Sequence, residues 1–111
     1  MNRGDIWIVN LDPGLGREMH KKRPALIISR NIIHQATTSV IIIPISSQIP
    51  QTVGPEMIIL HKDAGVEKTS VLLPIFIRCI DQARLVKKIG NLPMKTMNEV
   101  EETIKLILDL S

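Results

Sequence analysis

Three residues of one short stretch could act together on a phosphate group. Glu18, His20 and Arg23 bring a carboxylate, an imidazole and a permanent cation into a small part of the chain. Pro24 lacks a backbone N–H and restricts the preceding residue to an extended conformation, so Arg23 should begin a strand that holds its guanidinium in place. A guanidinium held in this way suits the binding of phosphate oxygens. The stretch therefore indicates phosphate chemistry on a nucleic acid.

One reaction on RNA needs little more than these groups. In internal transesterification the 2′-hydroxyl of the RNA attacks the adjacent phosphorus, and the protein positions the phosphate, neutralises charge and moves protons. Arg23 would grip the phosphate oxygens and stabilise the extra charge of the transition state. Glu18 is the natural proton acceptor, because an arginine with a pKa above ~12 is a poor base. Ser46 or Ser47 could donate a hydrogen bond to a phosphate oxygen.

These residues also have ordinary structural interpretations. The cationic side chains between Arg17 and Arg23 fit a solvated face, which is what a charged run usually forms. Serines at the end of a strand commonly satisfy the local backbone of a turn, and His20 could be an exposed loop histidine. The residue types alone leave both interpretations open.

The sequence favours neither a metal site nor a cofactor. His20, His34 and His61 are scattered, and no cysteine and histidine lie at the spacing of metal ligands. The sequence also has no glycine-rich phosphate loop, nucleophile elbow or paired acidic motif. We therefore expect chemistry that depends on neither a metal ion nor an organic cofactor.

Length and composition predict a single domain from residue 1 to residue 111. A chain of 111 residues with 44% hydrophobic content can bury one ordinary core. The one cysteine, Cys79, lies in an apolar stretch, which favours a small buried side chain and a reducing cytoplasm. The longest apolar runs, such as residues 71–77, contain a proline and are too short to span a bilayer. We expect a cytoplasmic protein that does not enter a membrane.

Charge is divided unevenly along the chain. Residues 1–92 carry twelve Lys or Arg against seven Asp or Glu, whereas residues 93–111 carry two against four. The body is therefore +5 and the tail −2, so a polyanion such as RNA should approach the body. Aromatic residues make up only 2% of the chain, which argues against a stacking platform that binds single strands without sequence preference.

Short apolar runs separated by turn residues predict a succession of strands. The predicted strands are residues 5–11, 23–29, 39–45, 56–60, 69–73, 75–80 and 85–89. Pro44, inside the third, predicts an edge strand or a bulge because it cannot donate a ladder hydrogen bond. The loop of residues 12–22 is long for a hairpin and should carry binding function. So many short strands are typical of a small barrel.

A helix is predicted after the strands. Pro93 suits the first turn of a helix, where its missing N–H has no partner to lose. Apolar residues then recur at helical spacing, at Met97, Val100, Ile104, Ile107 and Leu108. This pattern indicates an amphipathic helix that packs on the barrel. The predicted fold is mainly β with a C-terminal helix.

Several motifs follow one another in the order and at the spacing of a known family. They are RGDIW at residues 3–7 leading into NLDP at 10–13, GRE at 16–18, RPALII at 23–28, PISSQ at 44–48, and IRCID at 77–81 with RL at 84–85. Through these motifs the chain resembles the MazF/PemK family of toxin endoribonucleases over essentially its whole length. The family commonly has threonine where this chain has Ser46. After the glutamate it usually has glutamine and small residues, where this chain has MHKK at residues 19–22.

The resemblance implies a fold, an activity and partners. From the resemblance we expect a small SH3-like β-barrel of the MazF/PemK/CcdB-like kind with a C-terminal helix, and a homodimer that binds a cognate antitoxin. The activity is metal-independent, sequence-selective cleavage of single-stranded RNA (mRNA), with catalysis by Arg23, Ser46 and Glu18. The 2′-hydroxyl attack leaves 2′,3′-cyclic phosphate and 5′-hydroxyl ends. For RNA binding we expect contributions from Arg17, Met19, His20, Lys22, Ser47, Gln48 and Arg78.

Two alternatives remain at this level. A CcdB-like toxin shares the fold but binds and poisons DNA gyrase, which would require no Arg23–Ser46 pair. An SH3-like interaction module without activity is the second, although the scarcity of aromatic residues argues against a groove for proline-rich peptides. Incubation with RNA, and a gyrase supercoiling assay, would separate these possibilities.

Overall fold

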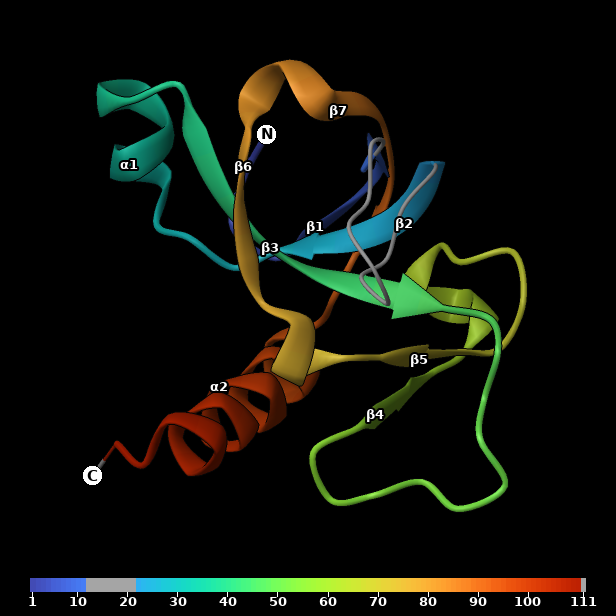
Figure 1. Ribbon diagram of the computed structural model, residues 1–111. Helices are drawn as coiled ribbons and strands as arrows, with labels where there is room; N and C mark the ends of the chain where they lie inside the picture. The colour runs from blue at the N-terminus through green and yellow to red at the C-terminus, as the bar shows by residue number, and fades with distance from the viewer. Residues whose placement is uncertain (12–21, 111) are drawn as a thin grey trace.

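A curled antiparallel sheet and a C-terminal helix make up most of the computed structural model, which describes residues 1–11 and 22–110 (Figure 1). The predicted binding loop, residues 12–22, lies outside these residues except for Lys22. The strands are β1 Asp5–Asn10, β2 Lys22–Ile27, β3 Ser39–Ser46, β4 Ile58–Leu60, β5 Ser70–Leu72, β6 Arg78–Asp81 and β7 Leu85–Asn91. The helices are α1 Asn31–Ala36 and α2 Met94–Leu108, with 3₁₀ turns at Lys62–Ala64, Pro74–Phe76 and Gln82–Arg84. The prediction of a mainly β fold with a C-terminal helix is confirmed.

The strand order in the sheet is β4-β5-β3-β2-β1-β7, with β6 paired to β3. One side of β3 changes partner along its length, because residues 39–42 pair with β6 whereas residues 45 and 46 pair with β5. Pro44 lies next to this change, opposite Ala25 of β2, and its carbonyl accepts a hydrogen bond of 3.0 Å from the Leu73 N–H. Pro44 was predicted to mark an edge strand or a bulge. The edge strand is wrong, because β3 is central, and the proline is tolerated where the ladder on one side is interrupted between β6 and β5.

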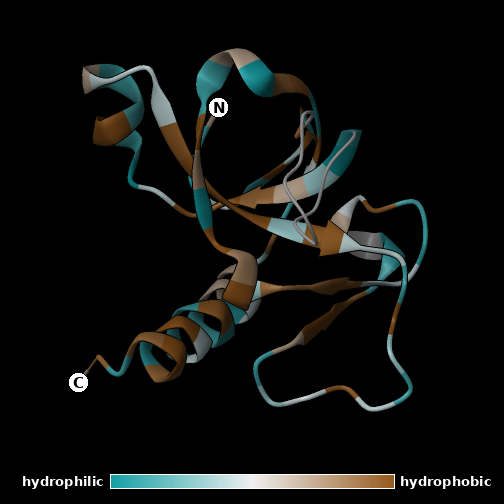
Figure 2. Cartoon of the chain, in the orientation of Figure 1, coloured by the Kyte–Doolittle hydropathy of each residue, from teal (hydrophilic) through white to brown (hydrophobic). Residues whose placement is uncertain are grey.

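The core is divided between the two faces of the sheet, as the alternation of side chains along a strand requires. In β2, Leu26 packs in one cluster with Ile6 and Ile43, whereas Ala25 and Ile27 pack in a second cluster. The helix α2 covers the first cluster with Met97 and Val100. Figure 2 shows hydrophobic and hydrophilic residues alternating around this helix, as the amphipathic pattern predicted. Because both faces carry apolar clusters, the strands that bear the site are fixed from both sides.

Three local expectations were wrong. The strand predicted from residue 75 begins only at Arg78, because Pro74 opens a 3₁₀ turn. Cys79 is exposed: it pairs with Ile41, while its neighbour Ile80 occupies the buried face of β6. Leu108 is 51% exposed although it continues the helical stripe, so the last turn of α2 extends past the apolar cluster.

The connection between β4 and β5 rests on β7 through two glycines. Gly65 has a φ of +96°, a conformation that favours glycine. A Cβ atom on Gly65 would collide with the Ile89 carbonyl oxygen, and a Cβ atom on Gly90 would collide with the Ala64 carbonyl oxygen. The two backbones can approach this closely only because neither residue has a side chain.

A buried serine and a histidine fasten α1 to β3. The Ile41 N–H donates a hydrogen bond of 3.0 Å to Ser29 Oγ, which lies 2.6 Å from His34 Nε2. Which of the two groups donates in this contact depends on the histidine tautomer, and the buried His34 Nδ1 has no hydrogen-bond partner among the described residues. Burial, and secondarily the positive amino terminus, lower the pKa of His34. The folded state therefore favours the neutral imidazole.

We expect this pair to make stability depend on pH. With its pKa lowered in the folded state, His34 contributes stability fully above its usual pKa of 6.5, and that contribution is lost as the pH falls from 6.5 through the lowered value. Urea unfolding at pH 7.5 and 5.5 should show a decrease in the wild type that His34→Gln largely lacks. His61→Gln, at an exposed histidine, should behave like the wild type. Equal pH dependence in the wild type and His34→Gln would contradict the assignment.

Candidate functional site

The pairing of β2 with β3 brings together two of the predicted catalytic residues. The ladder joins Ile27 with Ile42 and Ala25 with Pro44. Continuing this antiparallel register by two residues sets Arg23 across from Ser46, at the end of both strands. Arg23 is half-buried and also pairs with Val9 of β1, so its backbone is held on a second side. The expectation that Arg23 lies at the beginning of a strand is confirmed.

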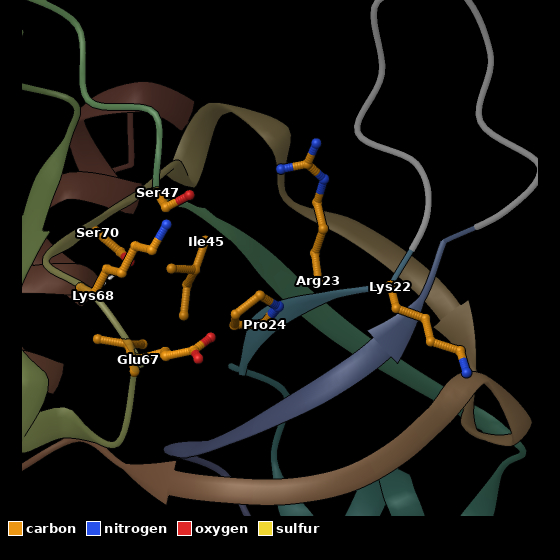
Figure 3. A pocket seen from close by; sticks show the side chains of 9 residues that line it. Lys22, Arg23, Pro24, Ile45, Ser47, Glu67, Lys68 and Ser70 are labelled. Carbon is orange, nitrogen blue, oxygen red and sulfur yellow. Dashed lines mark hydrogen bonds between the residues drawn. The ribbon is translucent and has the colours of Figure 1, made fainter.

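A pocket of about 260 Å³ opens beside this strand end. Its lining consists of Lys22, Arg23, Pro24, Ile45, Ser47, Val66, Glu67, Lys68 and Ser70. Figure 3 shows the side chains of Ser47 and Lys68 on the wall opposite Arg23, with Glu67 near Pro24, whereas the Lys22 side chain extends away from the others. The pocket therefore lies between β2 and the segment that leads into β5.

Ser46 and Ser47 play different structural roles. Ser46 is only 6% exposed, and its Oγ accepts a hydrogen bond of 3.1 Å from the N–H of Gln48. A hydroxyl that accepts such a bond keeps its own proton for donation. Ser47 is exposed and lines the pocket. Of the two serines considered from the sequence, Ser46 shapes the strand end and Ser47 presents its hydroxyl to the pocket.

The other predicted site residues lie in different parts of the structure. Gln48 is exposed just after β3. Arg78 pairs with Ile42, four residues along β3 from Ser46, which corresponds to about 13 Å at the rise of a strand. Arg78 is thus on a neighbouring part of the sheet and does not line the pocket. The remaining predicted site residues lie outside the described residues: Arg17, Glu18, Met19 and His20.

The sequence did not single out the second wall of the pocket. Glu67 and Lys68 lie in the connection before β5, and Ser70 begins that strand. Ser70 is 4% exposed and donates a hydrogen bond of 2.8 Å to the Lys68 carbonyl, which fixes the backbone there. In the sequence these residues formed only a charged turn. They approach Arg23 because β5 pairs with β3, with Val71 opposite Ser46.

The pocket can bind an anion and can also accept hydrogen bonds. Arg23 and Lys68 supply cations, Ser47 a hydroxyl, and Glu67 a carboxylate on the same lining. Two cations near one another suit phosphate oxygens. In the described part of the chain, no group of three or more His, Cys, Asp or Glu residues could hold a metal ion. Across residues 1–11 and 22–110, no helix is long and apolar enough to cross a membrane.

A model of PemK-like, MazF-like toxins of type II toxin–antitoxin systems matches residues 2–108 of the chain. The protein belongs to this toxin family. Among relatives of this PemK/MazF chain, Endoribonuclease EndoA from Bacillus subtilis is 33% identical over 111 residues, covering 99% of this chain and 96% of EndoA. Endoribonuclease PemK from Escherichia coli is 32% identical, covering 97% of this chain and 82% of PemK. The family resemblance seen in the motifs is confirmed.

Solved structures confirm the fold of this PemK/MazF chain. MazF from Deinococcus radiodurans superposes with a TM-score of 0.86 at 24% identity, covering 98% of this chain and 96% of that structure. An endoribonuclease from a mycobacterial species, solved in complex with its cognate antitoxin, gives a TM-score of 0.82 at 19% identity, covering 100% and 97%. The alternative of a CcdB-like gyrase poison gains no support from these relatives.

Proposed function

We propose that this protein is the toxin of a type II toxin–antitoxin system and that it cleaves single-stranded mRNA in the cytoplasm, selectively by sequence and without a metal ion. The observation that carries this proposal is the pocket at the start of β2, which Arg23 lines together with a second cation, Lys68. The β2–β3 register, continued by two residues beyond Ala25 and Pro44, would set Arg23 across from Ser46. Support also comes from the relatives EndoA and PemK, which are named endoribonucleases. Family membership alone would not identify which residues act.

The proposed reaction uses the RNA's own 2′-hydroxyl as nucleophile. Arg23 binds the non-bridging oxygens of the scissile phosphate and stabilises the charge that develops on them. A hydroxyl, from Ser46 or Ser47, donates a further hydrogen bond. Glu18 takes the proton of the 2′-hydroxyl as the new O2′–P bond forms. The P–O5′ bond breaks and O5′ takes up a proton, which leaves a 2′,3′-cyclic phosphate and a 5′-hydroxyl.

Cleavage of a long RNA in the presence of a chelator tests the proposal. The purified protein should give discrete fragments in excess EDTA, and kinase should label their 5′ ends without prior phosphatase treatment. Both results follow because the mechanism requires no metal and leaves a 5′-hydroxyl. Intact RNA, together with inhibition of gyrase supercoiling, would instead favour the gyrase poison.

The antitoxin is proposed to compete with RNA for the basic body. The +5 charge of residues 1–92 would attract an acidic, partly disordered segment of an antitoxin as readily as an RNA strand. We also propose a homodimer, which sedimentation would test. Titration with the antitoxin should suppress cleavage in proportion to the sites occupied. Tight simultaneous binding of RNA and antitoxin would refute the competition.

A further inference from the structure

We propose that Glu67 selects the base of one nucleotide next to the cleavage point and that Lys68 holds the adjoining phosphate. This inference rests on the proposed function and names the part of the pocket that sets sequence preference. Both residues are exposed and line the pocket on the side contributed by the segment before β5, facing the Arg23 side. Arg23 lines the same pocket, so a strand whose phosphate is bound by Arg23 would reach this wall.

The size of the pocket favours a single nucleotide unit. Its volume of about 260 Å³ is below the range of about 300–1,000 Å³ that is usual for whole drug-sized ligands. One nucleotide unit, a base with its adjoining phosphate, can therefore be bound along this lining, and the rest of the strand lies outside. Of the three apolar residues on the lining, Ile45 and Val66 are buried, so the partly exposed Pro24 offers the accessible surface for the flat face of a base.

The charge of Glu67 determines which base it favours. An ionised carboxylate only accepts hydrogen bonds. On the Watson–Crick edge, which is accessible in single-stranded RNA, guanine presents two adjacent donors, N1–H and the N2 amino group. Cytosine and adenine each present one amino donor beside an acceptor nitrogen, and uracil presents one N–H between two carbonyl oxygens. Glu67 should therefore prefer guanine and disfavour uracil most strongly.

The wall is built firmly enough to discriminate between bases. The residue before Glu67, Val66, is buried, and the one after it is fixed through the hydrogen bond from Ser70 Oγ to the Lys68 carbonyl. One residue further back, Gly65 rests directly on Gly90 of β7. A recognition residue whose backbone is held on both sides loses little backbone freedom when it binds, which favours specificity.

Lys68 should contribute in a different way from Glu67. An ammonium group binds phosphate as a point charge and does not read the base. Lys68→Met should therefore weaken the binding of all RNA sequences about equally, and it should reduce the slope of log affinity against log salt by about one. Lys95→Met, at an exposed position of α2 outside the pocket, is the matched control and should change neither quantity appreciably.

Sequencing of the cut ends from a random RNA pool tests the selection by Glu67. Wild type should be enriched for guanine at one position near the cut, and Glu67→Gln should reduce that enrichment about tenfold or more, as for the loss of a bidentate base contact. Glu99→Gln makes the same change of charge on the exposed face of α2 and should keep the wild-type profile. An unchanged base profile in folded Glu67→Gln would overturn the inference.

A binding measurement separates this inference from the cleavage activity itself. Non-cleavable oligonucleotides with guanine or inosine at the selected position, or at each position in turn, differ only by the N2 amino group. Wild type should bind the guanine form more tightly, and Glu67→Gln should bind the two forms alike. If wild type cuts no RNA but shows this difference, the proposed activity fails and the base selection stands. If both proteins bind the two forms alike, the base selection fails whether or not RNA is cut.

Discussion

Arg23→Ala is expected to lower the rate of RNA cleavage at least about a hundredfold while leaving the protein folded. Arg23 lies at a strand end and lines the pocket, where its guanidinium would meet the charge that develops on the phosphate. Arg23→Lys keeps a cation but loses the planar fork, so it should recover only part of the activity. Single-turnover cleavage rates, together with urea unfolding of each variant, measure both effects.

Arg30→Ala is the matched control for this experiment. Arg30 is exposed, precedes α1 without a side-chain capping hydrogen bond, and does not line the pocket. Its removal takes away the same charge from the body, so any general electrostatic loss will be visible in this variant. Cleavage by folded Arg23→Ala within about tenfold of the wild-type rate, a difference of about 1.4 kcal/mol, would exclude the proposed role.

Replacing the single ribose before the cut with deoxyribose is expected to abolish cleavage at that bond. The change removes the nucleophile and leaves the phosphate, the base and the protein contacts in place, so the affinity should change little. Cleavage and equilibrium binding are measured on the same oligonucleotide pair. An oligonucleotide with the deoxyribose one position further upstream should still be cut. Cleavage of the first substrate at the original bond would rule out attack by the 2′-hydroxyl.

Much of the fold was predictable because local signals and the final structure agree. Pro24 and the apolar run after it identified β2, and Pro93 with the helical stripe identified α2. Expectations failed where the outcome depends on a distant partner. Pro44 was assigned to an edge strand or a bulge, because the sequence does not show that β6 and β5 share one side of β3. Cys79 was assigned to the core because it lies in an apolar stretch. Its exposed face follows from its register with Ile41, which the sequence does not show.

The candidate site, like the fold, was predictable only in part. Arg23 and Ser47 stood out by residue type and motif, and both line the pocket. Glu67 and Lys68 gave no comparable signal, since a charged turn is ordinary on a protein surface. Only the pairing of β5 with β3 carries them to the pocket. The role of Glu18 stays a prediction, because that residue lies outside the described part of the chain.

The pairing of the first strand with the seventh bears on how this protein is made. Asp5 of β1 pairs with Asn91 of β7, and Gly65 rests on Gly90. The segment that carries Glu67 and Lys68 is therefore docked only when β7 is in place. Contacts between residues so far apart in the chain form late and slowly. We therefore expect a nascent chain to lack a finished site until residue 91 has left the ribosome. Under the proposed function, the protein would thus be kept inactive while the ribosome is still translating the message that encodes it.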